Sequence, residues 1–307
     1  MTTDAAALPA RSPAFGAQLL AHHVLPVATL VALIILLWYA LAVWLNAPQV
    51  IVRLGGAEGS WSTRELLRGC WSMERPVLPA PHQIAQDLYQ SVFGTPVESK
   101  RSLVFHAGVT VSATALGFVL GAVLGIVLAA GIVHLSVLDR SLLPWVIASQ
   151  TVPILAIAPM IVVVLGNLGL SGLLPKAIIS MYLCFFPVTI GMVKGLRSPD
   201  PLQLDLMRTY SASESQVFWK LRWPAATAFL FASLKVAIAV SLVGAIVGEL
   251  PTGAQAGLGA RLLSGSYYGQ TIQIWSALIM ASFVGVGLVF LVGRAERVVT
   301  RGREIPA

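Results

Sequence analysis

The chain has 307 residues, of which 57% are hydrophobic and only 11% are charged, and its mean hydropathy is +0.82. A water-soluble core cannot hide this much apolar surface, so the composition excludes a soluble globular protein and indicates a protein dissolved in lipid. The formal net charge of +7 fits anchoring to anionic lipid. We expect no nucleic-acid partner, because no stretch combines clustered basic and aromatic residues.

Six segments are long and apolar enough to cross a hydrocarbon core, which takes about 20 helical residues. Their length excludes buried strands, so the sequence predicts an all-α membrane protein with about six transmembrane helices. We expect these spans at approximately 24–45, 109–133, 143–166, 176–194, 226–249 and 273–293. The predicted domains are a cytoplasmic tail (1–23), the first transmembrane helix (24–45), a periplasmic connection (46–108), a core of five transmembrane helices (109–293) that includes the polar segment 195–225, and a basic cytoplasmic tail (294–307).

Lys and Arg residues are divided unevenly between the two sets of short loops and tails. With a cytoplasmic N-terminus, the outer short loops hold only Lys176 and Arg261. The inner loops and tails then hold Arg11, Arg140, Lys194, Arg197, Arg208, Lys220, Arg222, Arg294, Arg297, Arg301 and Arg303. Because positive residues are retained on the cytoplasmic side, both termini are predicted to be cytoplasmic.

The 46–108 connection ends in a stretch where Ile84, Leu88 and Val92 are spaced four residues apart. This spacing predicts an amphipathic helix. We favour a helix that rests on the membrane interface, and a docking surface for an extracytoplasmic partner is the alternative.

The second span carries Gly117, Gly121 and Gly125, also four residues apart. Three positions without side chains on one helix face allow another helix to approach closely. We favour packing within the bundle over a role in lining a solute path.

Residues 195–225 form an unusually polar segment between the fourth and fifth spans. Asp200 followed by Pro201 predicts a helix start, since Asp accepts a capping hydrogen bond and Pro needs no donor at the first position. This first helix should run to about Thr209. The sequence SASESQ then offers two overlapping capping boxes, Ser211 with Glu214 and Ser213 with Gln216.

A second helix is expected to run to about Arg222 and to end before Pro224, which opens the fifth span. A helix, a polar turn and a helix of this length suit insertion into the groove of another protein. Val217, Phe218 and Leu221 would make the apolar contacts.

The segment from 205 to 224 resembles the coupling motif of binding-protein-dependent ABC transporter permeases. That motif is Glu-Ala-Ala, three residues, Gly and, after a fixed interval, an apolar residue and Pro. The matching positions here are Asp205, Leu206, Met207, Ser211 and Trp223-Pro224. Leu206 and Met207 are bulkier than the alanines of the family, and Ser211 replaces its Gly, where a left-handed turn costs more.

The resemblance extends from about Leu78 to Arg294 and includes LPAPHQIAQDL, TVPILAIAP and VGEL, followed by Gly257-Leu258-Gly259. These runs are similar to the branch that imports sulfonates, taurine, nitrate and thiamine precursors. The resemblance implies a type I importer permease bundle with a cytoplasmic coupling helix pair, in the bacterial inner membrane. It also implies three partners: an ATP-binding-cassette ATPase dimer that uses the ATP, a second permease subunit, identical or paralogous, and a periplasmic solute-binding protein.

Two ionisable residues of the fifth span are candidates for the translocation path. Lys235 lies inside the span, where an unpaired charge is costly, and we favour snorkelling to the cytoplasmic surface over a solute contact. Glu249 lies at the outer end, as a gating residue or as a carboxylate that caps or pairs with Arg261.

The third span contributes three further candidates. Gln150 and Thr151 lie just before Pro153, which disturbs a helix. They face a translocation path or hydrogen bond within the bundle.

Catalytic and cofactor motifs are absent from the sequence. It contains no G-x-x-x-x-G-K-[ST] loop, no H-E-x-x-H, no G-x-S-x-G and no Cys or His pair with metal-ligand spacing, so we expect no enzyme, cofactor or metal site. An ion-coupled secondary transporter is the alternative function, but it predicts an internal repeat and ionisable residues at the midplane, and neither is evident.

The nature of the solute is suggested only by local resemblance. The run from Lys220 to Glu249 is slightly more similar to permeases for pyrimidine-type vitamin precursors or riboflavin than to those for sulfonates, taurine or nitrate. An aromatic heterocycle is therefore slightly favoured.

The predicted orientation is tested by reporter tags. Tags at the N-terminus, after Ile305 and within 195–225 should report the cytoplasm, and a tag near Gly59 should report the periplasm, because the Lys and Arg bias sets the orientation of the chain in the membrane. A cytoplasmic signal at Gly59 would overturn the orientation.

Overall fold

The computed structural model describes residues 25–56, 61–251 and 256–301. The predicted N-terminal tail and the end of the basic tail lie outside these residues. All regular elements in the described ranges are helical, as predicted, and the chain divides into two units, residues 1–85 and 86–307. Five helices are long and apolar enough to cross a membrane, and a bent helix pair counted as one span makes six.

The first unit holds α2 (Leu25–Arg53), α3 (Thr63–Trp71) and the first turn of α4 (Pro81–Val92). Its centre is the fully buried amide of Asn46. The amide nitrogen donates to the carbonyls of Cys70 (3.3 Å) and Leu78 (2.9 Å), and the oxygen accepts from the Val77 N–H at 2.8 Å. One side chain thereby fixes α2 against the segment that follows α3. The first span is thus longer than predicted, and the helix α3 was not predicted at all.

The predicted amphipathic stretch is helical and forms α4. Ile84 is only 1% exposed. Leu88 and Val92 pack against a buried cluster that includes Leu103 and Leu258. Leu88 and Val92 are half-buried against this cluster, so the protein covers part of the apolar face of α4, and a position at the membrane interface stays a prediction.

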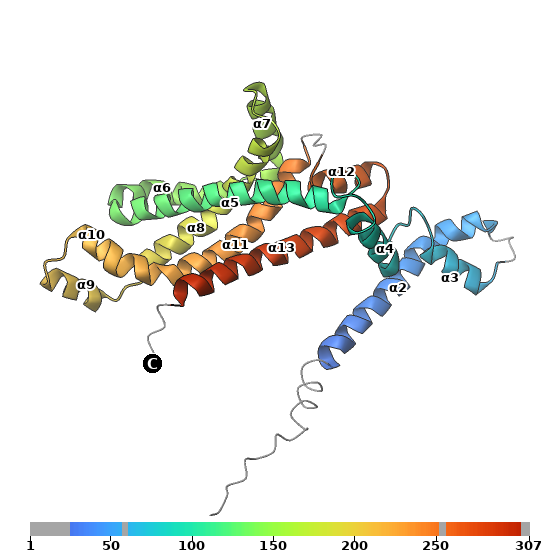
Figure 1. The fold of residues 1–307 in the computed structure, drawn as a ribbon, viewed down its shortest axis with the longest axis horizontal. Helices are drawn as coiled ribbons and strands as arrows, with labels where there is room; N and C mark the ends of the chain where they lie inside the picture. Colours follow the sequence, from blue (N-terminus) through green and yellow to red (C-terminus); the bar gives the residue numbers. More distant parts are fainter. Residues whose placement is uncertain (1–24, 57–60, 252–255, 302–307) are drawn as a thin grey trace, which may run out of the picture. The chain divides into compact units, whose positions relative to one another are not determined.

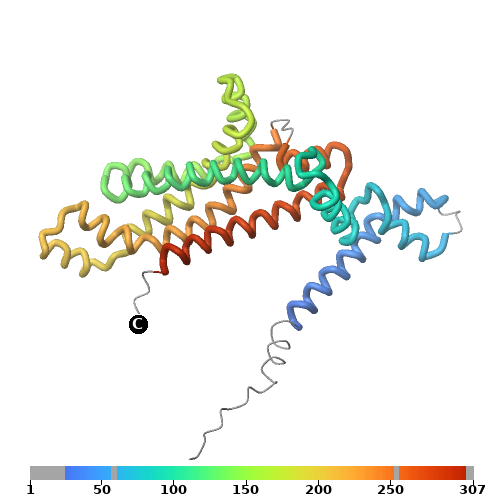
Figure 2. Tube along the Cα trace, viewed as in Figure 1, coloured from blue at the N-terminus to red at the C-terminus, as the bar shows by residue number. Residues whose placement is uncertain are grey.

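The second unit is a bundle built on α5 (Leu103–His134), α8 (Leu173–Leu196), α11 (Trp223–Glu249) and α13 (Thr271–Thr300) (Figure 1). The short helix α12 (Leu258–Tyr267) precedes α13. Helix α8 packs against both α5 and α11, and the tube in Figure 2 follows these long helices side by side. The core of the bundle is therefore the contact of α8 with its two neighbours.

Small residues allow these helices to approach closely, as the glycine spacing predicts. A Cβ atom at Gly121 would lie 2.7 Å from the Cβ of Cys184, and one at Gly125 would lie 2.8 Å from the Cβ of Val188. On the opposite side of α8, a Cβ at Gly244 of α11 would lie 2.8 Å from the Cα of Ser180. Packing, not solute lining, explains the glycine stripe of α5.

A buried hydrogen-bond chain joins the same three helices. The Ser180 hydroxyl of α8 donates to the Ser241 carbonyl of α11 at 2.8 Å. The Ser241 hydroxyl donates to the Thr114 carbonyl of α5 at 3.1 Å. All three side chains are fully buried, so the hydroxyls are satisfied inside the bundle, as the absence of water in a bilayer requires.

The predicted third span, 143–166, is not one straight helix. It is a pair, α6 (Ser136–Ser149) and α7 (Ile154–Asn167), bent by 98° at the break. Pro153 has no N–H to donate to the Ser149 carbonyl and disfavours helical geometry at the residue before it. The Tyr182 hydroxyl of α8 donates to that carbonyl instead, so a tertiary contact stabilises the break.

Candidate functional site

The predicted coupling segment lies at one end of the bundle, between α8 and α11 (Figure 1). It begins with α9 (Pro201–Thr209), which has Pro201 at its first position. The Asp200 carboxylate caps this helix by accepting from the Leu202 N–H at 2.7 Å. The start and end of this helix agree with the sequence prediction.

The turn after α9 has the left-handed geometry that the family motif implies. Ser211 has φ of 50°, and it is the one non-glycine residue with positive φ in the described part of the chain. The N–H of Ser211 bonds to the Arg208 carbonyl (2.8 Å), and the N–H of Ala212 bonds to the Met207 carbonyl (3.0 Å). These two bonds form a Schellman motif, which satisfies helix-end carbonyls despite the cost of a side chain at this φ.

The second helix of the segment starts as predicted but does not end before Pro224. Of the two possible capping boxes, the one of Ser213 with Gln216 is formed. Helix α10 (Glu214–Val217) then continues through a π-helical turn, η3 (Phe218–Arg222), into α11. The Trp223 N–H bonds to the Phe218 carbonyl five residues earlier. The wider turn lets the chain pass a proline that cannot donate, so one helix of 36 residues runs from Glu214 to Glu249.

Helix α9 presents an apolar stripe that the sequence prediction overlooked. Leu202, Leu206 and Tyr210 are spaced four residues apart and are 77%, 56% and 77% exposed. Asp205, on the same helix, pairs with Arg208 at 2.9 Å in full solvent contact, and such an exposed pair contributes little to stability. Met207 is half-buried. The spacing of the stripe was readable in the sequence.

The predicted apolar contacts of the second helix lie closer to the bundle. Val217, Phe218 and Leu221 are each half-buried. The Phe218 ring lies 5.0 Å from the His134 ring of α5 and 6.0 Å from that of Trp223 (ring centroids), and it packs on the main apolar core. Phe218 therefore supports the foot of α11.

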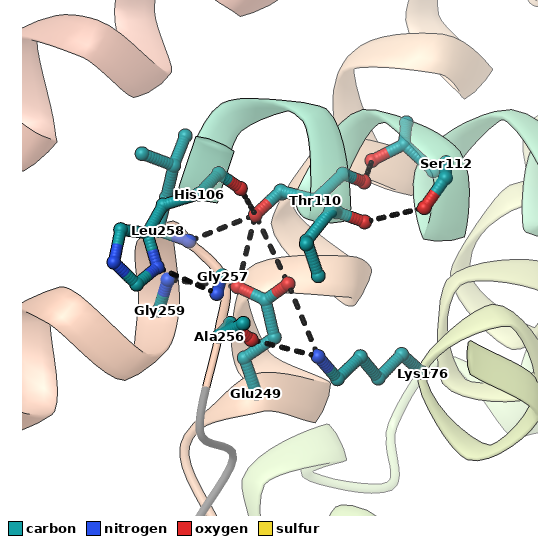
Figure 3. A network of polar contacts seen from close by, with 11 residues as sticks. His106, Thr110, Ser112, Lys176, Glu249, Ala256, Gly257, Leu258 and Gly259 are labelled. Carbon is teal, nitrogen blue, oxygen red and sulfur yellow. Dashed lines mark hydrogen bonds and ion pairs between the residues drawn. The ribbon is translucent and has the colours of Figure 1, made fainter. Parts of the chain in front are cut away.

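The far end of the 36-residue helix enters a buried polar network (Figure 3). The Glu249 carboxylate is fully buried. It accepts from the Thr110 hydroxyl of α5 at 3.0 Å and from the Gly259 N–H at 2.8 Å, and the Lys176 ammonium of α8 lies 3.6 Å away. Lys176 also donates to the Ala256 carbonyl at 3.0 Å.

This network caps the N-terminus of α12 with side chains from other helices. The first N–H groups of a helix lack partners within it. Here the Gly257 N–H donates to His106 Nδ1 (2.9 Å), the Leu258 N–H to Thr110 Oγ1 (2.9 Å) and the Gly259 N–H to Glu249. A carboxylate at this position also faces the positive end of the helix dipole. Residues of α5, α8 and α11 therefore fix the position of α12.

The ionic partners differ from those expected from the sequence. Of the roles expected for Glu249, the capping role is observed at the Gly259 N–H, whereas its ion pair is with Lys176 rather than with Arg261. Burial lowers the pKa of the Arg261 guanidinium, and the charge of Asp87 opposes this shift. The Lys235 ammonium pairs with Glu296 of α13 at 2.5 Å and is still partly exposed, and both the snorkelling and the solute contact expected for it stay predictions.

The third-span candidates lie at the break between α6 and α7. Thr151 is exposed and donates to the Ala148 carbonyl at 2.8 Å, and Gln150 donates to the Ser149 hydroxyl. Pro153 precedes α7. Both hydrogen bonds are made to residues close in the chain. That Gln150 and Thr151 line a translocation path remains a prediction.

His106, Thr110 and Lys176 were not among the predicted functional residues. A single polar residue near the start of an apolar span carries no indication of its partner in the sequence. Thr110 and Glu249 are 139 residues apart in the chain. Only the folded structure brings such distant residues together.

Comparison with known proteins assigns a transport family. Residues 121–304 match the family described as "Binding-protein-dependent transport system inner membrane component". A probable ABC transporter permease of Haemophilus influenzae is 29% identical, over 70% of this chain and 82% of the relative. The formylaminopyrimidine transport permease ThiX of Halalkalibacterium halodurans is 32% identical (60% and 68%), and the riboflavin permease RibX of Chloroflexus aurantiacus is 28% identical (73% and 80%).

The buried network predicts a large effect of one neutralising substitution. Glu249→Gln should destabilise the protein by about 3–5 kcal/mol, because it leaves the Lys176 ammonium buried without its counter-charge. The double variant Lys176→Met/Glu249→Gln should recover part of this loss. Thermal unfolding in detergent measures both effects, with Glu296→Gln as the matched control at a half-exposed ion pair. An unfolding temperature of Glu249→Gln equal to that of the unchanged protein would contradict the assigned role.

Proposed function

Because this chain belongs to the family of binding-protein-dependent transport system inner membrane components, we propose that it docks on its ATPase partner through α9. It is the multi-pass permease of an ABC importer in the inner membrane, and it is not an enzyme. A component of such a system works with an ATPase and a solute-binding protein. ATP is then used by the ATPase, and the permease itself binds no cofactor.

The exposed stripe of α9 is the observation that carries this proposal. Leu202 and Leu206 on α9 and Tyr210 at its C-cap place three large apolar side chains outside the bundle, and an amphipathic helix of this kind fits a hydrophobic groove. Large apolar surface of this kind marks an interaction site when nothing in the protein covers it. Asp205 and Arg208 would lie at the polar rim, where charges set orientation more than affinity.

The turn and the following helix transmit the docking event. The two Schellman bonds at Ser211 fix the angle between α9 and α10. From Glu214 onward the chain is helical as far as Glu249, so a displacement of α9 moves α11 along its length. The Arg222 guanidinium donates to the Leu196 carbonyl at 3.0 Å, which ties the foot of α11 to the end of α8.

This arrangement supports a two-state mechanism. ATP binding closes the ATPase dimer, α9 follows its groove, and α11 acts as a lever that switches the pore between inward and outward opening. The lever ends at Glu249, the residue that caps α12, so α12 is the element whose position would respond. Both termini and α9 are cytoplasmic in this scheme, and a second permease subunit completes the pore.

For the solute we propose an aromatic heterocycle such as a pyrimidine-type vitamin precursor or riboflavin. Among the relatives, the permeases with formylaminopyrimidine and riboflavin in their names are 32% and 28% identical. The aliphatic sulfonate permease of Bacillus subtilis and the nitrate permease of Synechocystis are 25% and 24% identical. This difference in identity supports the heterocycle.

The docking proposal predicts a selective loss of ATPase binding. Leu206→Ala should weaken ATPase affinity more than tenfold, since truncation of a buried interface anchor costs about 2 kcal/mol. Leu278→Ala on α13, at another exposed leucine, is the matched control and should bind as before. Phe218→Ala should instead lower the unfolding temperature of the isolated permease. Full ATPase affinity and full transport in Leu206→Ala would refute the docking surface.

The solute proposal is tested by uptake into proteoliposomes that contain the permease, its ATPase and its binding protein. ATP-dependent uptake of labelled formylaminopyrimidine or riboflavin is expected, and labelled taurine and nitrate should stay outside. Uptake restricted to taurine or nitrate would show that the protein belongs to the anion importers.

A further inference from the structure

We propose that a groove between α6, α8 and α11 binds one anionic phospholipid, whose phosphate lies beside Lys194 and Arg197. The groove has a volume of about 530 Å³, which falls within the range of about 300–1,000 Å³ of small-ligand sites. Its walls are Leu143 and Ile147 of α6, Ile190 and Val193 of α8, and Phe229 of α11. It therefore offers a lipid tail an almost wholly apolar surface.

Cationic groups occur at one end of the groove. Lys194, Arg197 and Ser198 complete its lining, and Lys194 lies in the last turn of α8. Arg197 pairs with Asp139 of α6 at 2.9 Å, and its side chain is still 43% exposed. Because the pair is neutral, Lys194 supplies the one positive charge in excess. The Arg197 guanidinium also has further N–H donors for a phosphate.

The end of α8 would ordinarily repel an anion, because its last carbonyls carry partial negative charge. Here two of these carbonyls are already occupied. Arg222 donates to the Leu196 carbonyl, and the Ser198 hydroxyl donates to that of Gly195 at 2.7 Å. These two carbonyls therefore oppose an anion beside Lys194 less than free carbonyls would.

The combination favours a lipid over a water-soluble anion. A soluble anion needs polar donors around most of its surface, whereas five of the eight lining residues are apolar. Ile147 is 52% exposed, so the groove opens on the outside of the helices. A ligand with an acyl chain and a phosphate matches both the apolar walls and the cationic end of the groove.

The site adjoins the predicted coupling segment. Arg197 and Ser198 lie only three and two residues before Asp200, the cap of α9. A lipid held there would order the connection from α8 to α9. The inference rests on the cytoplasmic placement of α9 from the proposed function, and the reporter tags test that placement separately.

Native mass spectrometry of the delipidated protein tests the site with two defined lipids of identical acyl chains. Phosphatidylglycerol should bind more tightly than phosphatidylcholine, and Lys194→Gln should weaken phosphatidylglycerol about fivefold, since one basic residue near a membrane surface contributes about that factor. Phosphatidylcholine binding should not change. Arg140→Gln, an exposed cation of α6 that does not line the groove, is the matched control and should bind as the unchanged protein does.

Three outcomes would overturn the proposal. Equal binding of the two lipids, or equal losses in Lys194→Gln and Arg140→Gln, would remove the assigned headgroup contact. Displacement of phosphatidylglycerol by inorganic phosphate alone would identify a simple anion site. Crosslinking of two copies of an Ile147→Cys variant in membranes would show that a second copy covers the groove.

Discussion

Close approach of α8 to both α5 and α11 is the constraint on which the rest of the structure depends. Lipid gives no hydrophobic drive between apolar helices, so contact must come from tight packing and internal hydrogen bonds. Gly117 and Gly244 admit Ser180 from opposite sides, and the Ser180 hydroxyl reaches Ser241. This contact fixes α11, and with α11 it fixes both functional ends of the permease.

The two ends differ in burial and in polarity. At one end α9 is exposed and carries a short apolar stripe that includes Leu206, the surface proposed to dock on the ATPase. At the other end the charges of Lys176 and Glu249 are buried, and their hydrogen bonds cap α12. A helix of 36 residues joins the two, about 54 Å at 1.5 Å per residue. Its π-helical turn lies near the exposed end, so most of the lever is ordinary α-helix.

Elements determined by local chemistry were predictable from the sequence. Asp200-Pro201, the Ser213–Gln216 box and the apolar runs act within a few residues, and the spans and α9 follow from them. The π-helical turn was not predicted. The rule that a helix ends before proline does not consider a wider turn, which lets the helix continue although Pro224 has no N–H to donate. The partners of Glu249 were not predictable, since pairing in three dimensions leaves no periodic trace in the chain.

The central claim, that α10, the π-helical turn and α11 move as one rigid lever, is tested by spin labels at Ser215 and Val243 in a background without native cysteines. The distance between them, measured in the reconstituted complex, should be the same without nucleotide and with trapped ATP. The distance from Val243 to Val286 of α13 should change between the two states. A Ser215–Val243 distance that shifts with ATP would show that the helix bends at the π-helical turn and would contradict the lever.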